Sequence, residues 1–169
     1  KRLVKRYLAS FGPATARDVA TWAGFAAIGK TLDAMRAELV EFEDQFGRKL
    51  YDLPKMDILE GAEAAPVRFV AEYDNLVLAH ADRTRVLPDA HRKRVTLTAG
   101  RVLATVLIDG FARGVWKVEK QKKVAQLRVD LFAKPNKKLL REVNREAERL
   151  IEFAEPHFPN REFDVRWIV

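Results

Sequence analysis

The sequence predicts an α+β protein in which a winged-helix domain precedes a small antiparallel sheet covered by a long C-terminal helix. Residues 1–53 carry three helical apolar stripes, then two apolar segments around a charged turn. Asp109-Gly110 lies between two apolar runs, which is typical of a two-residue β-hairpin turn. Apolar residues recur at helical spacing over about residues 136–154. These observations predict a winged-helix domain over 1–53, a linker over 54–66 and an α+β hairpin domain over 67–169.

The first domain is expected to begin with three helices. Apolar positions mark the first over about residues 3–11, and Gly12-Pro13 ends it. Thr15 is the expected N-cap of the second, because Asp18 follows at capping-box spacing. The third is expected over about residues 26–39, where the apolar positions are Ile28, Leu32, Met35 and Leu39.

The two segments after these helices form the expected wing. Its turn contains Arg48 and Lys49, which could contact phosphate, but three acids lie beside them: Glu41, Glu43 and Asp44. Opposite its apolar stripe, the third helix has Lys30, Asp33 and two alanines, a poor set for reading bases in the major groove. The residues therefore favour a winged helix used as a scaffold over one that reads sequence.

The second domain is expected to start with a short strand at residues 67–70 and one or two helical turns over 74–79. With Asp109-Gly110 as the turn, the predicted cross-strand pairs are Ile108 with Phe111, Leu107 with Ala112, Val106 with Arg113 and Leu103 with Trp116. One face would then be apolar, with Leu103, Leu107, Ala112, Trp116 and Val118. The other face would carry Arg113 and Lys117.

Three further elements complete this domain. Residues 123–132 alternate between apolar and polar and predict a third strand. Pro135 precedes the long helix, whose apolar stripe is expected to cover the apolar face of the sheet. Phe163, Val165 and Trp167 alternate with polar residues and predict a closing strand.

The loop expected between residues 83 and 101 is strongly basic. It has six cationic residues and a single acid, Asp89. Such density is typical of a segment that contacts phosphate, and a solvated charged loop is the alternative. A second cluster comprises Lys117, Lys120, Lys122 and Lys123. The candidate DNA-binding residues are Arg83, Arg85, Arg92, Lys93, Arg94, Arg101, Arg113, Lys117, Lys30, Arg48 and Lys49.

The composition narrows the class of protein. A net charge of +7 over 169 residues favours a polyanionic partner. The absence of cysteine excludes disulfides and thiolate sites and agrees with a reducing cytoplasm. No apolar run is long enough for a membrane span, and no signal peptide is recognisable, so no membrane partner is expected. Because Lys1 already lies within an amphipathic pattern, we expect the chain to be part of a longer protein.

The sequence offers little for catalysis or metal binding. His80, Asp82 and His91 have a spacing that occurs in metal sites, but the cationic neighbourhood opposes binding of a cation. There is no nucleophile elbow and no glycine-rich phosphate loop. We therefore predict no catalytic residue, metal or cofactor in this chain.

Several segments resemble the C-terminal half of the winged-helix DNA glycosylases, the AlkZ-like family. They are LYDLP at residues 50–54, VRFVAEYDNLVLAHADRTRVLP at 67–88, HRKRV at 91–95 and TVLIDGFARGVWKVE at 105–119. The resemblance implies binding of duplex DNA, a hairpin that enters the minor groove and excision of alkylated or crosslinked bases. It also implies a catalytic Gln-x-Gln or Gln-x-Asp motif near the N-terminus of the full-length protein. The glutamines here, Gln45, Gln121 and Gln126, stand in no such motif, so we expect the catalytic half to lie outside this chain.

Three functional hypotheses remain open from the sequence. The first is a DNA-binding part of a glycosylase-like protein, with double-stranded DNA and the remaining N-terminal part of the same protein as partners. The second is a bacterial winged-helix regulator without base chemistry. The third is a protein-interaction module. The oligomeric state is not predicted.

Overall fold

The computed structural model describes residues 1–56 and 64–168 and divides into two compact units. Unit 1 contains Lys1–Ala62 and Asn75–Arg83, and unit 2 contains Glu63–Asp74 and Thr84–Val169. Within the expected linker at 54–66, residues 57–63 lie outside the described residues. Nowhere in the described part of the chain is a helix both long and apolar enough to cross a membrane.

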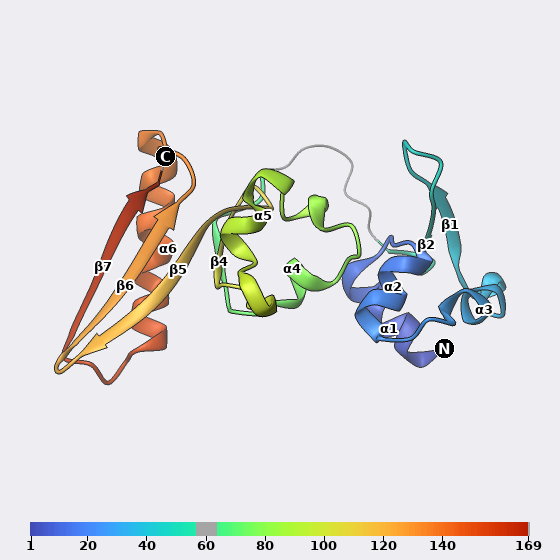
Figure 1. Cartoon of the computed structure of the whole chain (residues 1–169), viewed down its shortest axis with the longest axis horizontal. Helices are drawn as coiled ribbons and strands as arrows, with labels where there is room; N and C mark the ends of the chain where they lie inside the picture. Colours follow the sequence, from blue (N-terminus) through green and yellow to red (C-terminus); the bar gives the residue numbers. More distant parts are fainter. Residues whose placement is uncertain (57–63, 169) are drawn as a thin grey trace. The chain divides into compact units, whose positions relative to one another are not determined.

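Unit 1 is a bundle of short helices with a two-stranded antiparallel sheet (Figure 1). Its elements are α1 (Arg2–Phe11), α2 (Ala16–Ala23), α3 (Ile28–Asp33), the 3₁₀ turn η1 (Arg36–Glu38), β1 (Val40–Glu43), β2 (Lys49–Asp52) and α4 (Asn75–Leu78). The Thr15 side chain accepts a hydrogen bond from Asp18 N–H, and the Asp18 carboxylate accepts one from Thr15 N–H, so the predicted capping box is confirmed. Gly24 ends α2 in the left-handed conformation, with φ of 70°.

The predicted third helix over 26–39 is too long. Only Ile28–Asp33 is α-helical, and the chain then tightens, with Met35 N–H donating to Leu32 O at 2.9 Å. No side chain of the described residues caps the start of α3, which leaves a short helix that packing must stabilise. Ile28, Leu32 and Met35 are nevertheless all buried, so the apolar spacing identified the inward residues correctly.

The segment Asn75–Arg83 follows a strand of unit 2 in the chain but packs in unit 1. The hydroxyl of Tyr7 donates a hydrogen bond to Ala79 O at 2.8 Å. Trp22 Nε1 donates to Asn75 Oδ1 at 3.3 Å. These contacts attach the segment to α1 and α2.

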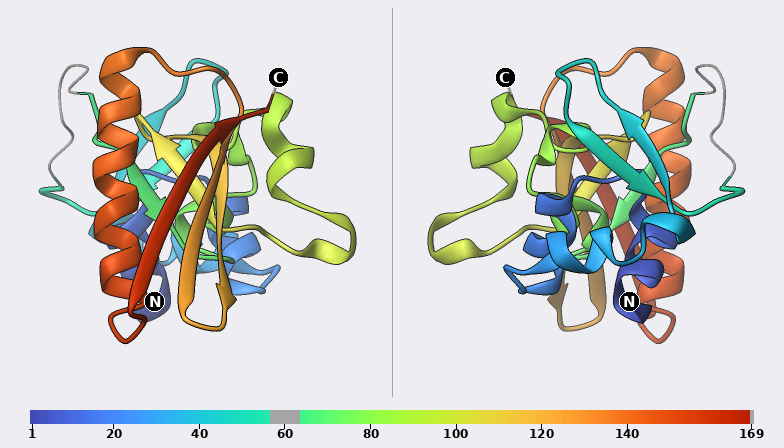
Figure 2. Two further views of the ribbon diagram at one scale, coloured as in Figure 1. Left: turned by 90° about the vertical axis from the view of Figure 1, so that its left-hand side faces the viewer. Right: turned by 90° about the vertical axis from the view of Figure 1, so that its right-hand side faces the viewer.

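Unit 2 is a five-stranded sheet with one long helix, α6 (Lys137–Ala154), against it (Figure 2). The strand order is β3 (Arg68–Val70), β4 (Thr105–Ile108), β5 (Phe111–Gln121), β6 (Val124–Leu131) and β7 (Asn160–Trp167). Asn136 caps α6 by accepting from Leu139 N–H. Val143, Ala147 and Ile151 of α6 join strand residues in one buried apolar cluster, as predicted. Burial of apolar area, worth about 25 cal/mol per Å², is the main stabilising contribution here.

The expectation of a purely antiparallel sheet is wrong at one edge. β7 pairs with β6 in parallel, with Leu127 opposite Phe163. The physical reason is that α6 lies between these two strands in the chain. A helix that crosses the sheet returns the chain to the end where the previous strand began, so the next strand runs parallel.

The predicted hairpin register holds only near its turn. Ile108 pairs with Phe111 and Leu107 with Ala112, as predicted, but Val106 pairs with Gly114 instead of Arg113. A β-bulge inserts Arg113 as an extra residue, which also overturns the predicted pairing of Leu103 with Trp116. A Cβ on Gly114 would lie 2.9 Å from Asp130 O, so glycine is required at this close approach.

The bulge changes which side chains share a face. Val106, Ile108, Trp116 and Val118 belong to the cluster packed on α6. Leu107 and Ala112, predicted on the same face as Trp116, are buried outside that cluster. A shift of one residue moves side chains to the opposite face of a sheet, because successive side chains alternate.

Candidate nucleic-acid interface

The basic segment at residues 83–101 is helical over much of its length and not the loop that was expected. It contains the 3₁₀ turns η2 (Arg83–Arg85) and η3 (Thr98–Gly100) and the α-helix α5 (Asp89–Val95). Asp89 lies in the first turn of α5 and three cations lie in its last turn, which complements the helix dipole. Leu87 and Val95, both buried, anchor the two ends of the helix.

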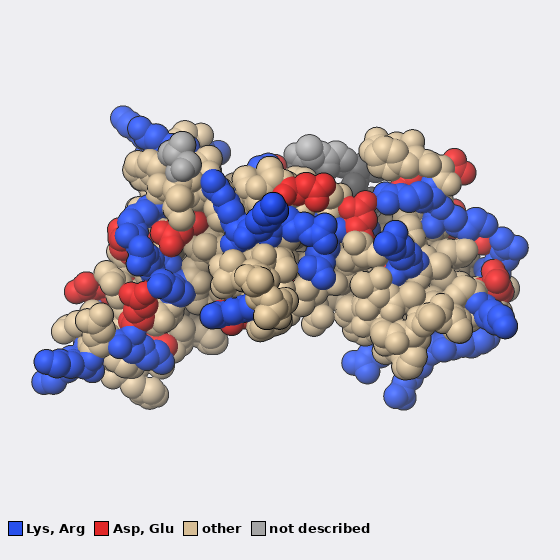
Figure 3. Space-filling view, viewed as in Figure 1, with Lys and Arg blue, Asp and Glu red and all other residues tan. Residues whose placement is uncertain are grey.

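Arg92 and Lys93 are the most available cations of this segment. Both are exposed on the last turn of α5, and neither forms an ion pair with any described residue. Figure 3 shows Lys and Arg side chains gathered on the visible face over the part of unit 2 that holds α5. Within the same segment, Arg83 is half-buried and Arg85 is exposed. The exposed end of α5 can therefore present positive charge to a polyanion without first breaking an ion pair.

Arg94 and Arg101 are engaged within unit 2. Arg94 Nη1 lies 3.4 Å from both Phe132 O and Ile168 O, and its guanidinium lies over the Phe132 ring. Arg101 pairs with Glu72 at 2.6 Å. The hydrogen bond to Glu72 raises the pKa of the Arg101 guanidinium above its ordinary value.

Two candidates lie on β5. Arg113 is the extra residue of the β-bulge; its Nη1 lies 3.4 Å from His91 Nε2, and its guanidinium lies 5.6 Å from the centre of the Phe111 ring. Lys117 forms an ion pair with Glu119 on the same strand. The hydrogen bond from Lys117 lowers the pKa of the Glu119 carboxyl.

The candidates in unit 1 are poorly placed for phosphate contacts. Lys30 is exposed on α3, with Asp33 exposed in the next turn. Lys49 Nζ lies 2.8 Å from Glu41 Oε2. The hydrogen bonds from Lys49 and Arg36 lower the pKa of Glu41. Of Lys30, Arg48 and Lys49, Lys30 alone has no ion pair to a described residue.

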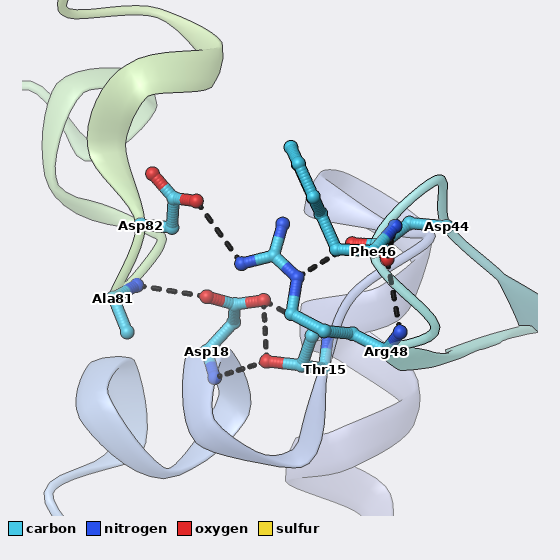
Figure 4. A network of polar contacts seen from close by, with 7 residues as sticks. All are labelled: Thr15, Asp18, Asp44, Phe46, Arg48, Ala81 and Asp82. Carbon is cyan, nitrogen blue, oxygen red and sulfur yellow. Dashed lines mark hydrogen bonds and ion pairs between the residues drawn. The ribbon is translucent and has the colours of Figure 1, made fainter.

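Arg48 has a structural role in unit 1 (Figure 4). Its Nε donates to Asp44 Oδ2 at 2.5 Å and its Nη1 to Asp82 Oδ2 at 3.1 Å. These hydrogen bonds raise the pKa of the guanidinium, the contribution of Asp44 being the larger. Arg48 therefore links the β1–β2 turn to the segment Asn75–Arg83.

Asp18 makes a second link to that segment (Figure 4). One carboxylate oxygen accepts from Ala81 N–H at 2.9 Å, and the other accepts from the hydroxyl and N–H of Thr15. Burial raises the pKa of Asp18, but these hydrogen bonds and the nearby His80 outweigh burial and leave the pKa below its ordinary value.

The residues considered for a metal site have other surroundings. His80 is buried, with its Nε2 3.1 Å from Phe11 O. Asp82 is paired with Arg48. Across residues 1–56 and 64–168, no three His, Cys, Asp or Glu side chains form a group that could hold a metal ion.

Lys134 is a surface cation that the sequence analysis did not select. Its Nζ lies 5.9 Å from the centre of the Trp167 ring, and it lines a pocket with His91 and Arg113. These residues come from a loop, two strands and a helix that are far apart in the sequence. No local pattern could have grouped them.

Comparisons with known proteins agree with the resemblance seen in the sequence. The family model for "DNA glycosylase AlkZ-like" matches residues 1–153. An "Interstrand DNA cross-link repair glycosylase" of Streptomyces sahachiroi is 28% identical over 130 residues, which cover 72% of this chain and 35% of that protein. The solved structure of Streptomyces sahachiroi DNA glycosylase AlkZ superposes with a TM-score of 0.73 at 24% identity, over 98% of this chain and 44% of that one. The chain thus shares the fold and spans about a third of the length of the curated relative.

Proposed function

This chain belongs to the AlkZ-like DNA glycosylase family, and from that premise we propose that it is the DNA-binding part of a glycosylase-like repair protein. The relationship supports a DNA repair function. The observation that carries the DNA-binding proposal is the pair Arg92 and Lys93, exposed on α5 without a carboxylate partner among the described residues. Duplex DNA offers closely spaced phosphates, and unpaired cations on one helical turn suit them.

The proposed contact is to the DNA backbone and not to the bases. Phosphate contacts set the position of a protein on the duplex and carry no sequence information directly. The acids near Arg48, Lys49, Arg101 and Lys117 already neutralise those cations. Binding through α5 is therefore expected to be strong at low salt and nearly independent of sequence.

In this proposal unit 1 is a winged-helix domain with a scaffolding role. Its first three helices precede a two-stranded antiparallel sheet, which is the order of elements in that fold. α3 exposes Lys30 and Asp33, and the repulsion of phosphate by Asp33 offsets its attraction by Lys30. We place the protein in the cytoplasm, because a chain without cysteine has no disulfide of the kind that oxidising compartments favour.

Base excision is proposed to need residues outside this chain. Gln45 lies in the β1–β2 turn, and Gln121 and Gln126 lie on β5 and β6. None of the three stands in a Gln-x-Gln or Gln-x-Asp motif. We expect the chain by itself to release no alkylpurine from methylated duplex; release above a heat-inactivated control would refute this part of the proposal.

Duplex binding is tested by fluorescence anisotropy with a labelled duplex of about 20 base pairs in about 50 mM salt, conditions in which phosphate contacts dominate. Replacing both Arg92 and Lys93 with glutamine should weaken binding about 10- to 100-fold, because two phosphate contacts are lost. The matched control is Lys122→Gln with Lys123→Gln, which removes the same charge from the exposed β5–β6 turn. No binding by the unaltered chain, or equal losses in the two double variants, would overturn the proposal.

A further inference from the structure

A small pocket lies in unit 2 where α5, the bulged hairpin and the start of α6 meet. Its volume is about 240 Å³. Ile108, Leu131 and Leu139 form apolar walls, and His91, Arg113 and Lys134 are its polar side chains. Pockets for drug-sized ligands have about 300–1,000 Å³, so this one suits a small group that belongs to a larger ligand.

The charge of the pocket selects an anion. Among the described residues that line it there is no carboxylate. Neither Arg113 nor Lys134 has an ion pair with any residue of the described ranges. Phosphate is the anion that a DNA-binding unit meets.

His91 lines the same pocket and lies against Arg113. Its Nδ1 is buried and has no hydrogen-bond partner among the described residues, while its Nε2 lies 3.4 Å from Arg113 Nη1. Burial, then Arg113 and Arg94, lower the pKa of His91, so the imidazole is neutral at pH 7. An Nε2 that accepts from arginine leaves the ring proton on Nδ1. The neutral ring adds no charge to the pocket, so its attraction for an anion comes from Arg113 and Lys134.

An exposed aromatic ring stands beside the pocket. Trp167 is 42% exposed, pairs with the pocket residue Leu131 across the parallel strands, and has Lys134 Nζ 5.9 Å from its ring centre. The C-terminal end of β7 lies beside α5 (Figure 2), consistent with the contact of Arg94 with Ile168 O. Aromatic rings next to cations are the usual platform for unpaired bases.

We propose that this site binds an unpaired nucleotide of DNA. Its phosphate accepts hydrogen bonds from Arg113 and Lys134, and its base stacks on Trp167. A base inside an intact duplex has both faces covered by its neighbours, so only a nucleotide displaced from the stack can make both contacts. The inference rests on the proposed function, since it names the kind of DNA that unit 2 prefers.

The test compares two labelled duplexes that differ by a single unpaired thymidine bulge. The unaltered chain should bind the bulged duplex on the order of tenfold more tightly, the lower part of the effect of stacking one base. The Arg113→Gln, Lys134→Gln variant should lose this preference, while the charge-matched Lys122→Gln, Lys123→Gln variant should keep it. The bulged duplex should quench the tryptophan fluorescence of the unaltered chain. The Trp167→Phe variant should lack this quenching, which would assign the signal to Trp167.

The outcomes separate this inference from the duplex-binding proposal. Equal affinity for the two duplexes, or a bulge preference that survives the Arg113 and Lys134 changes, overturns the inference. If duplex binding still depends on Arg92 and Lys93 in that case, the proposed function stands without it. If neither duplex binds, both fall.

Discussion

Salt dependence of DNA binding would show which cations contact phosphate. Each phosphate contact contributes about −0.9 to the slope of log K against log salt concentration. The sequence alone, with six cations at residues 83–101, suggests that this segment contributes strongly to the slope. If Arg92, Lys93 and Arg94 each contacted one phosphate, their loss would flatten the slope by almost three units. The structure lowers this value, because Arg94 is held by two carbonyl oxygens and the Phe132 ring.

We therefore expect the change of Arg92 and Lys93 to alanine to flatten the slope by about 1.8 units, the sum for two contacts. Adding Arg94→Ala should change it little further. Lys30→Ala, on α3, should alter the slope by less than about 0.9, the value for one full contact. The change of Arg48 together with Arg101 is the comparison for paired cations, since each already binds a carboxylate.

The assay is anisotropy titration of one duplex at four salt concentrations for each variant. Circular dichroism would show that each variant is folded, which matters most for Arg48 because it links two parts of unit 1. If the Arg48 and Arg101 variant flattens the slope as much as the Arg92 and Lys93 variant, ion pairing does not keep cations from DNA and the reasoning fails. A dominant effect of Lys30 would make α3 the DNA-binding element.

Three further predictions concern stability and protonation. Trp116→Ala should lower the free energy of unfolding by about 2–4 kcal/mol in urea melts, because the ring stacks on Phe69 and its Nε1 donates to Val70 O. The loss should be smaller than for a fully buried tryptophan, because the ring is half-buried. A loss below about 1 kcal/mol would contradict the packing on α6. Asp18→Ala should cost about 2–4 kcal/mol at pH 7, because it leaves the N–H groups of Thr15 and Ala81 without the carboxylate that accepts their hydrogen bonds. Since the pKa of Asp18 is lowered by folding, this contribution should be complete above about pH 4 and disappear as the pH falls through the folded-state pKa; a difference independent of pH would contradict it. The NMR titration of His91 should have its midpoint below the ordinary pKa of 6.5, because burial, Arg113 and Arg94 disfavour the imidazolium and the cation Lys134 lines the same pocket. Addition of the bulged duplex should raise that midpoint, and an unchanged midpoint would contradict a phosphate in the pocket.

Local signals in the sequence predicted much of the fold. The Thr15–Asp18 capping box, the Asp109-Gly110 turn and the helix at 137–154 were all found as expected. Each depends on residues close together in the chain, where short-range sterics and hydrogen bonds decide the conformation. The errors lie where distant segments meet. The bulge at Arg113 and the parallel pairing of β7 depend on partners that no local pattern specifies.

The sequence by itself determined where positive charge is concentrated and to which family the chain is similar. Only the tertiary structure decided which of those charges remain available. Glu72 pairs with Arg101 and Asp82 with Arg48, and both acids are distant in the chain from the arginines they neutralise. Folding likewise brings Lys134 to Trp167 and His91 to Arg113. Electrostatic interactions depend on separation in space, which the order of residues along the chain does not contain.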